Sequence, residues 1–286
     1  MRFTKMEGAG NDYVYVDLFE ESIDLSDAPQ LARDVSDRHF GIGGDGLILL
    51  APSKIADVRM VMFNADGSRA EMCGNGVRCL AKLAHDRGRA ASNPMRVETD
   101  GGVRDVELRF RDGAVSGARV SMGVPAMESA LIPVVLDDEP GLDGERVVDR
   151  PLVVLDRTFA ITCVSMGNPH CVVYVDDVDA FDVARYGPAI ESHKMFPEHA
   201  NVEFVQVLDS ERVRQRTWER GSGETLACGT GACAAAVAGR LTARGGAVTH
   251  VTLRGGELFL EWDGEGPVFM SGPAVEVFRG DWSTRD

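Results

Sequence analysis

The strongest constraint on the fold is a short motif that occurs twice. Met-Cys-Gly-Asn-Gly spans residues 72–76 and Ala-Cys-Gly-Thr-Gly spans residues 227–231, so the leading cysteines are Cys73 and Cys228. A helical stretch with a second cysteine follows each motif, and the two motifs are 155 positions apart. A motif repeated with its surroundings indicates two similar structural halves.

Smaller echoes upstream keep the same order. Gly10-Asn11 followed by Val14–Asp17 has a counterpart in Gly167-Asn168 followed by Val173–Asp176. Because these echoes share one order and nearly one offset, the sequence predicts a duplicated domain. We expect the first half to span residues 1–118, with the tail at 273–286 packed against it, and the second half to span 119–272.

Short strand-like runs dominate the chain, and several alternate apolar and polar residues. Helical patterns are fewer, and we expect them at Pro29–Ser36, Gly76–Arg87, Ala180–Ile190 and Gly231–Thr242. Strands in series with few crossover helices predict an α+β fold and argue against a doubly wound parallel sheet. The Pro- and Gly-rich stretch Pro133–Glu145 predicts a surface loop.

Composition excludes several classes of partner. The 30 basic and 45 acidic residues give a net charge of −15, which repels nucleic acid and anionic membranes. No apolar run approaches the roughly 18 residues of a membrane span, and Met1–Asp12 does not read as a secretion signal. We therefore expect a cytoplasmic protein. The six cysteines form no Cys-x-x-Cys pair, so we expect reduced thiols and no metal site.

Each repeated cysteine precedes a Gly-x-Gly turn that leads into a helix. The glycines permit close backbone approach and positive φ, and the free amides at a helix start bind anions. The same field stabilises a thiolate, so we expect a lowered pKa for Cys73 and Cys228. The residues after Gly231 are apolar on all sides, which predicts a buried helix.

Two thiols on opposite faces of one substrate carbon supply the acid and the base that stereoinversion requires. One thiolate would remove the α-proton while the other thiol returns a proton to the opposite face. The plain alternative is that these cysteines are small buried hydrophobes, which we accept for Cys79, Cys163, Cys171 and Cys233. For Cys73 and Cys228, the glycine-flanked repeat favours chemistry.

Longer motifs carry a resemblance to a known family. They are Asn-Asp at 11–12, Phe-Asn-Ala-Asp-Gly-Ser at 63–68, Cys-Gly-Asn-Gly-x-Arg-Cys at 73–79, Ser-Met-Gly-Asn-Pro-His-Cys at 165–171, Trp-Glu-Arg-Gly-x-Gly-Glu-Thr at 218–225 and Ala-Cys-Gly-Thr-Gly-Ala-Cys at 227–233. Together they resemble diaminopimelate epimerase from Met1 to about Gly272. The resemblance implies two barrel-like antiparallel sheets, each around a central helix, with the site in the cleft between them. It also implies a homodimer.

The resemblance further implies an isomerase that interconverts LL- and meso-2,6-diaminopimelate, without pyridoxal phosphate or metal, in lysine and peptidoglycan precursor synthesis. It implies that Cys73 and Cys228 are the two bases and that His170 and Glu219 tune their pKa values. It implies a substrate-binding set of Asn11, Asn64, Gly74, Asn75, Asn168, Asn201, Glu219, Arg220, Gly229 and Thr230. The family often has a substrate-contacting glutamine where this chain has Gly46.

Other readings remain open at this stage. Arg220 can bind a carboxylate bidentately but could form a surface ion pair, Asn64 could be a turn residue, and His170 could be a core histidine. Gly41–Gly46 fits a dinucleotide-binding pattern, yet it leads from a loop into a strand. A proline-type two-thiol racemase and a non-enzymatic ligand-binding or redox protein are the competing functions.

Overall fold

The order of helices and strands in the first 121 residues recurs in the next 149. The computed structural model describes residues 1–135 and 145–283, so most of the predicted loop Pro133–Glu145 and the last three residues of the tail lie outside the described residues. The chain divides into two units: unit 1 comprises Met1–Ser121 and the residues from Ser271 onward, and unit 2 comprises Met122–Met270.

Unit 1 contains two helices and nine strands among its described residues. The helices are α1 (Ala28–Ser36) and α2 (Gly74–Asp86). The strands are β1 (Arg2–Gly8), β2 (Asn11–Asp17), β3 (Gly46–Ala51), β4 (Val58–Asn64), β5 (Arg69–Ala70), β6 (Met95–Thr99), β7 (Gly102–Arg111), β8 (Ala114–Ser121) and β18 (Val275–Asp281).

Unit 2 repeats this series. Its helices are η1 (Ser129–Leu131), α3 (Val183–Glu191) and α4 (Gly229–Leu241). Its strands are β9 (Arg150–Val154), β10 (Arg157–Ser165), β11 (Pro169–Tyr174), β12 (Asn201–Val207), β13 (Arg212–Glu219), β14 (Gly223–Thr225), β15 (Val248–Thr252) and β16 (Glu257–Glu261). Strand β17 (Phe269–Pro273) carries the chain from unit 2 back to unit 1.

Strand pairing shows the same pattern in both units. In unit 1 the order is β18-β1-β2-β3-β4-β6-β7-β8, and in unit 2 it is β9-β10-β11-β12-β13-β15-β16. The predicted α+β class is confirmed, but the sheets are mixed rather than wholly antiparallel. Pairs β2–β3 and β4–β6 are parallel, as are β11–β12 and β13–β15. The physical reason is that a helix crosses over between the two strands of each parallel pair.

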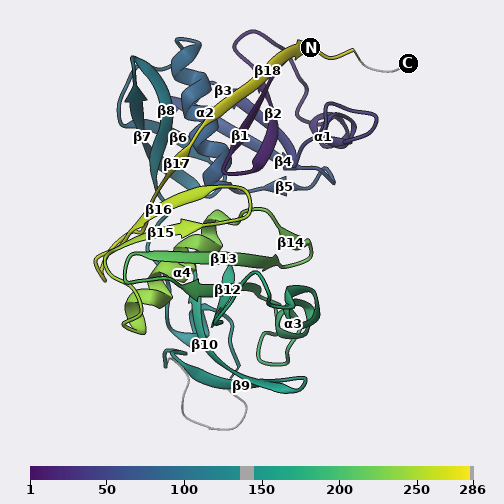
Figure 1. Cartoon of the computed structure of the whole chain (residues 1–286). Coiled ribbons are helices and arrows are strands. Elements are labelled where there is room, and N and C mark those ends of the chain that lie inside the picture. The colour runs from purple at the N-terminus through teal and green to yellow at the C-terminus, as the bar shows by residue number, and fades with distance from the viewer. Residues whose placement is uncertain (136–144, 284–286) are drawn as a thin grey trace. The chain divides into compact units, whose positions relative to one another are not determined.

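A helix lies inside the sheet of each unit (Figure 1). Helix α2 contacts the unit 1 strands β1, β2, β3, β4, β6, β7 and β8. Helix α4 contacts the unit 2 strands β10, β11, β12, β15 and β16. Residues Gly231–Gly239 of α4 are buried, which confirms the prediction from its apolar sequence. A sheet wrapped around one helix therefore holds that helix by burial on all sides.

Both central helices begin two residues before the predicted starts. The sequence pattern places the starts at Gly76 and Gly231, whereas the helices begin at Gly74 and Gly229. Glycine is a poor helix former, so the sequence pattern does not assign the two residues before Gly76 and Gly231 to the helices. Here the cysteine before each helix supplies the cap that lets the glycines join it.

Candidate functional site

Cys73 is the N-cap residue of α2. Its backbone is extended, with φ −129° and ψ 122°, and its sulfur accepts a hydrogen bond from the amide of Gly76 at 3.4 Å. The Tyr13 hydroxyl on β2 lies 3.7 Å from the same sulfur and donates to it. The first amides of a helix lack partners within the helix, so the thiol lies beside a group of free N–H donors.

Cys228 repeats this geometry at α4. Its φ of −127° and ψ of 111° match those of Cys73, and its sulfur accepts from the amide of Gly231 at 3.3 Å. The Thr230 hydroxyl lies 3.5 Å from the sulfur. Cys228 is buried, with 6% of its surface exposed, while Cys73 is partly exposed. The duplicated motif thus folds into two equivalent capped helix starts.

The glycines of the two motifs serve close packing. A Cβ atom on Gly76 would lie 2.7 Å from the Ile48 side chain, and one on Gly231 would lie 2.5 Å from the Glu203 carboxylate. Neither glycine has a positive φ, so the predicted need for that conformation was wrong at these positions. Each helix start packs too tightly against its sheet for any side chain.

The thiols do not have the lowered pKa values that the motif predicted. Burial raises the pKa of Cys73, although the Gly76 amide, the Tyr13 hydroxyl and the charge of Arg78 act to lower it. Burial also raises the pKa of Cys228 well above its usual range, and the carboxylates of Glu219 and Glu203 raise it further. The prediction failed because the motif indicates the helix amides near each sulfur but gives no information on how far the surrounding sheet removes the thiol from water.

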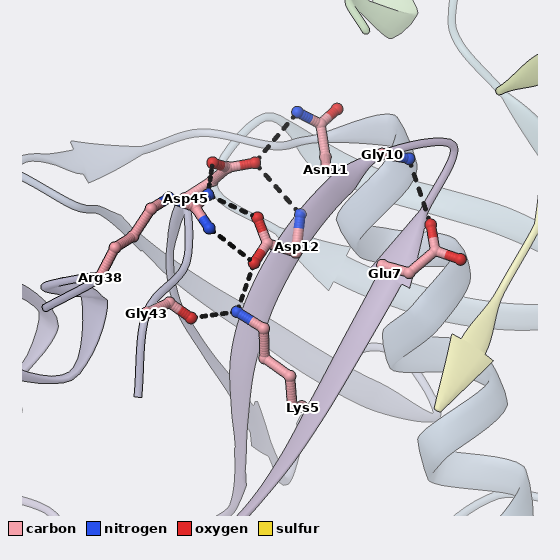
Figure 2. A network of polar contacts seen from close by, with 8 residues as sticks. All are labelled: Lys5, Glu7, Gly10, Asn11, Asp12, Arg38, Gly43 and Asp45. Atoms are coloured by element: carbon pink, nitrogen blue, oxygen red, sulfur yellow. Dashed lines mark hydrogen bonds and ion pairs between the residues drawn. The ribbon is translucent and has the colours of Figure 1, made fainter. Parts of the chain in front are cut away.

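A partly buried polar network holds Asn11 and Asn75 together in unit 1. Asn75 donates to the Asn11 side-chain oxygen at 2.5 Å, and Asn11 donates to Asp45 at 3.2 Å. Lys5, only 5% exposed, pairs with Asp12 at 2.6 Å and donates to the carbonyl of Gly43 (Figure 2). The network therefore fastens the loop after Gly41 to the start of β2.

Arg38 and Arg78 complete this region. Arg38 contacts both Asp12 at 2.7 Å and Asp45 at 2.9 Å, as Figure 2 shows. Arg78 is fully buried and donates to Asn75 at 2.8 Å and to the carbonyl of Gly74 at 3.2 Å. A fixed positive charge thus lies under the first turn of α2, beside Gly74 and Asn75. Neither arginine is among the site residues predicted from the sequence, and neither are Lys5 and Tyr13.

The corresponding region of unit 2 centres on His170. Its ring Nε2 lies 3.0 Å from the Asn168 side-chain oxygen, and its Nδ1 lies 2.8 Å from Glu203. Asn168 in turn donates to Thr230 at 3.4 Å, next to Cys228. The side chains of His170 and Glu203 are both fully buried. Glu203 was missed from sequence, although an acid between the apolar Val202 and Phe204 is a signal that could have revealed it.

Asn201, Glu219 and Arg220 lie at neighbouring strand ends of unit 2. Asn201 donates to the Pro169 carbonyl at 2.9 Å and accepts from the Arg220 amide at 3.0 Å. Burial raises the pKa of Glu219, which accepts a 2.5 Å hydrogen bond from the Thr225 hydroxyl. The Arg220 guanidinium donates to the Glu198 carbonyl at 2.9 Å. Within residues 1–135 and 145–283, Arg220 forms no ion pair, so its charge can receive a ligand carboxylate.

Asn64 lies at the end of β4, where it donates to Ser68 at 2.9 Å across a turn. It is directly opposite Gly46 on β3. A Cβ atom on Gly46 would overlap the carbonyl oxygen of Phe63 and lie 3.2 Å from the Cα of Asn64. The backbone at Gly46 therefore has no room for the glutamine that the family often carries there.

The structure thus groups the predicted residues in two sets, one in each unit. Unit 1 brings together Cys73, Gly74, Asn75 and Asn11, with Asn64 on an adjacent strand. Unit 2 brings together Cys228, Gly229, Thr230, Asn168, His170, Asn201, Glu219 and Arg220. Across the part of the chain that the structure describes, no group of three or more His, Cys, Asp or Glu side chains could hold a metal ion, and no helix is long and apolar enough to cross a membrane.

Comparison with known proteins decides the family. The family model described as diaminopimelate epimerase matches residues 3–128 and 162–277. The chain belongs to this family. It is 51% identical over 283 residues to the diaminopimelate epimerase of Desulfovibrio desulfuricans, covering 99% of this chain and 98% of that protein. It is 50% identical over 285 residues to that of Pelotomaculum thermopropionicum, covering all of both chains, and 44% identical over 282 residues to that of Methanococcus maripaludis, covering 98% and 99%.

More distant solved structures share the fold. A phenazine biosynthesis protein of the PhzF family from Bacillus anthracis superposes with a TM-score of 0.71 at 16% identity, covering 99% of each chain. A hydroxyproline epimerase from Agrobacterium vitis, solved with trans-4-hydroxy-L-proline, has a TM-score of 0.67 at 14% identity and covers 98% of this chain and 90% of its own. The predicted two-domain α+β architecture of this diaminopimelate epimerase family is thereby confirmed.

We predict that Gly46→Gln destabilises the fold by at least about 2 kcal/mol, because the new side chain must displace the β4 backbone. Urea unfolding followed by circular dichroism measures the loss. Gly101→Gln is the matched control: its nearest neighbours to a Cβ lie 3.7 Å away and its φ is not positive. We expect that control to change stability by less than about 1 kcal/mol. Equal stability of the two variants would contradict the steric argument.

Proposed function

We propose that this chain interconverts LL- and meso-2,6-diaminopimelate by a cofactor-independent, two-cysteine mechanism that serves lysine and peptidoglycan precursor synthesis. The observation that carries the proposal is the pair of capped helix starts, Cys73 on α2 and Cys228 on α4, in a member of an epimerase family. A stereoinversion needs an acid and a base, and the chain supplies two thiols, each at the N-cap of a central helix.

In one direction, the Cys73 thiolate takes the α-proton, and the electrons of the Cα–H bond move onto the α-carbon and its carboxylate. The Cys228 thiol then gives its proton to the opposite face of that carbon. The products are a Cys73 thiol, a Cys228 thiolate and the inverted amino acid. In the other direction the two sulfurs exchange roles, so no external acid, base or oxidant is consumed. The mechanism requires both sulfurs to reach one carbon.

The reacting carboxylate gains negative charge as the proton leaves, and helix amides suit that charge. Gly74 and Asn75 begin α2, and Gly229 and Thr230 begin α4. In our proposal these four residues bind the carboxylate through their backbone N–H groups, which the helix itself leaves unpaired. Donors fixed before the reaction stabilise the developing charge without having to reorganise.

The remaining substrate groups are assigned by chemistry. We propose that the side-chain oxygens of the asparagines and of Glu219 accept from the ammonium groups, while the amides and Arg220 bind the distal carboxylate. The substrate-binding set is Asn11, Asn64, Asn168, Asn201, Glu219 and Arg220. His170 and Glu219 tune the thiols in this proposal. For Glu219 the supporting observation is that its charge raises the pKa of Cys228.

A proline-type racemase is the competing function, because the distant fold relatives include a hydroxyproline epimerase. The distal groups separate the two functions. A proline-type substrate has one carboxylate and needs no cation for a second one. Arg220 forms no ion pair with a carboxylate of the described residues, so it suits the distal carboxylate of diaminopimelate. The relatives at 44–51% identity over nearly the whole chain also favour diaminopimelate.

We predict that Cys73→Ala and Cys228→Ala each reduce conversion of LL- to meso-diaminopimelate by about 10²–10⁴-fold, because each removes one proton-transfer group. Chiral chromatography of the product measures the loss. Cys79→Ala and Cys233→Ala are matched controls, since these buried cysteines lie in the same two helices. We expect both controls to retain most of the activity.

Full activity in either primary variant would refute the two-thiol mechanism. The wild-type protein in heavy water should incorporate deuterium at the α-carbon of LL-diaminopimelate and leave proline unlabelled. Labelling of proline alone would assign the chain to the competing function instead.

The pH dependence of kcat/KM follows from the thiols. Because burial raises the pKa of Cys73 above its ordinary value near 9, few molecules carry its thiolate at neutral pH, and activity should rise as the pH increases. Tyr13→Phe removes a hydroxyl that lowers the pKa of Cys73, so the rising limb should move up by about half a pH unit. Tyr174→Phe, in unit 2, is the control. A limb that stays in place or moves down would contradict the role of Tyr13.

We further propose, from the family resemblance, that the enzyme is a cytoplasmic homodimer. One chain has a mass of 30.9 kDa. We predict that sedimentation velocity at micromolar concentration finds a single species with twice this mass. A species that remains at the mass of one chain would exclude the dimer.

A further inference from the structure

Glu203 lies in a buried setting that costs free energy of folding. Its side chain is fully buried on β12, and one carboxylate oxygen lies 2.8 Å from His170 Nδ1. The other oxygen, Oε2, is buried and has no hydrogen-bond partner within the described part of the chain. A buried acid with an unsatisfied oxygen destabilises the fold, so its presence calls for an explanation beyond packing.

The internal repeat supplies a comparison. In unit 1 the parallel pair β2–β3 aligns Tyr13 with Gly46 and Tyr15 with Ile48. In unit 2 the parallel pair β11–β12 aligns His170 with Asn201 and Val172 with Glu203. Glu203 therefore occupies the position that Ile48 occupies in unit 1.

The two residues also meet the same part of their helices. Ile48 contacts the position where Gly76 would carry a side chain, and Glu203 contacts the equivalent position at Gly231. The protein thus has a carboxylate under the Cys228 helix and a hydrocarbon under the Cys73 helix.

The Glu203 carboxylate faces the Cys228 sulfur. A Cβ atom placed on Gly231 would lie 2.5 Å from Glu203 Oε1 and 3.2 Å from the Cys228 sulfur, so the carboxylate and the thiol border the same small space. The titratable groups around the sulfur are Glu203 from β12 and Glu219 from the end of β13, with His170 of β11 near both. Cys171, whose pKa Glu203 also raises, is on β11 next to His170. Of the His170–Glu203 pair, the Glu203 carboxylate is the group that shares the space beside Gly231 with the thiol.

The opposite sign of charge lies at the other thiol. Arg78 is buried beneath the first turn of α2 and acts to lower the pKa of Cys73. The helix in unit 2 has Cys233 at the equivalent place, five residues after Cys228, and so has no basic side chain there. The two local sites therefore share a backbone geometry but differ in electrostatics.

We propose that Glu203 is a positioning residue that fixes the His170 ring and, by its buried negative charge, keeps the Cys228 sulfur protonated in the resting enzyme. This inference rests on the proposed function, in which Cys228 then begins as the acid and Cys73 as the base. Glu203 touches neither reacting atom in this role. It assigns unequal starting roles to two thiols that the duplicated backbone presents identically.

The test measures the thiol itself and needs no substrate. In a Cys73→Ser background, the rate of iodoacetamide alkylation at Cys228 is followed by peptide mass spectrometry at about pH 8, where the rate reports the thiolate fraction. Glu203→Gln removes the charge and keeps the shape. We expect alkylation about threefold to tenfold faster, the range reflecting the weaker nucleophilicity of a more acidic thiol.

Three further variants check that the alkylation rate of Cys228 responds to the charge at position 203 and to the hydrogen bonds of the sulfur. Glu257→Gln removes an exposed acid of the same unit, which lies 3.3 Å from His250, and should leave the rate unchanged. Glu203→Ile copies the residue of unit 1 and should accelerate alkylation as Glu203→Gln does. Thr230→Val removes a hydrogen bond that lowers the pKa of Cys228 and should slow alkylation.

An unchanged or slower rate in a folded Glu203→Gln or Glu203→Ile protein would overturn the inference. If neither variant folds, the two thiols are compared directly, since Cys228 in Cys73→Ser should react more slowly than Cys73 in Cys228→Ser, and the reverse order would overturn it. Wild-type protein that fails to epimerise diaminopimelate would refute the proposed function but leave this thiol measurement intact. The two failures are therefore distinguishable.

Discussion

The structure depends on the burial of two helix starts. Each central helix is enclosed by the sheet of its own unit, so its first turn is largely withdrawn from water, although Gly229 and Thr230 are still partly exposed. The sulfur of the cysteine before each helix accepts a hydrogen bond from one of the first amides. Burial makes these amides effective donors to an anion because the local dielectric constant is low. The same burial raises the pKa of each thiol and opposes formation of the thiolate that the chemistry needs. The site is a compromise between these two effects.

The polar residues around each helix start adjust that compromise locally. In unit 1, Tyr13 and Arg78 favour negative charge on sulfur, and the Lys5 network holds Asn11 against Asn75. In unit 2, Thr230 and the Gly231 amide favour it while Glu219 and Glu203 oppose it. The duplication therefore preserved the backbone scaffold, while individual side chains came to differ where they face the sulfur.

Sequence reasoning recovered the parts of the site that are contiguous along the chain. The repeated Cys-Gly-x-Gly motifs, the burial of α4 and the α+β class can be predicted because each depends on neighbouring residues. The strand β13, which ends at Glu219, is harder to predict because its buried face includes the polar Gln215 and Thr217, with Gln215 donating to Thr217 at 2.9 Å. The pKa directions failed because hydration depends on the whole surrounding sheet. Glu203 was missed because its contact with the turn after Cys228 joins residues far apart in sequence.

The path of the chain has a consequence for its synthesis. Unit 1 is interrupted after Ser121 by the whole of unit 2, and its strand β18 pairs with β1 at the opposite end of the sequence. During translation, β1 is synthesised long before β18, so the edge of β1 that pairs with β18 stays unpaired until β18 has been made. The strands β9 to β16 of unit 2 are all synthesised before β18. Unit 2 can therefore complete its own sheet while unit 1 still has an open strand, and β1 is the segment most in need of protection from aggregation in that interval.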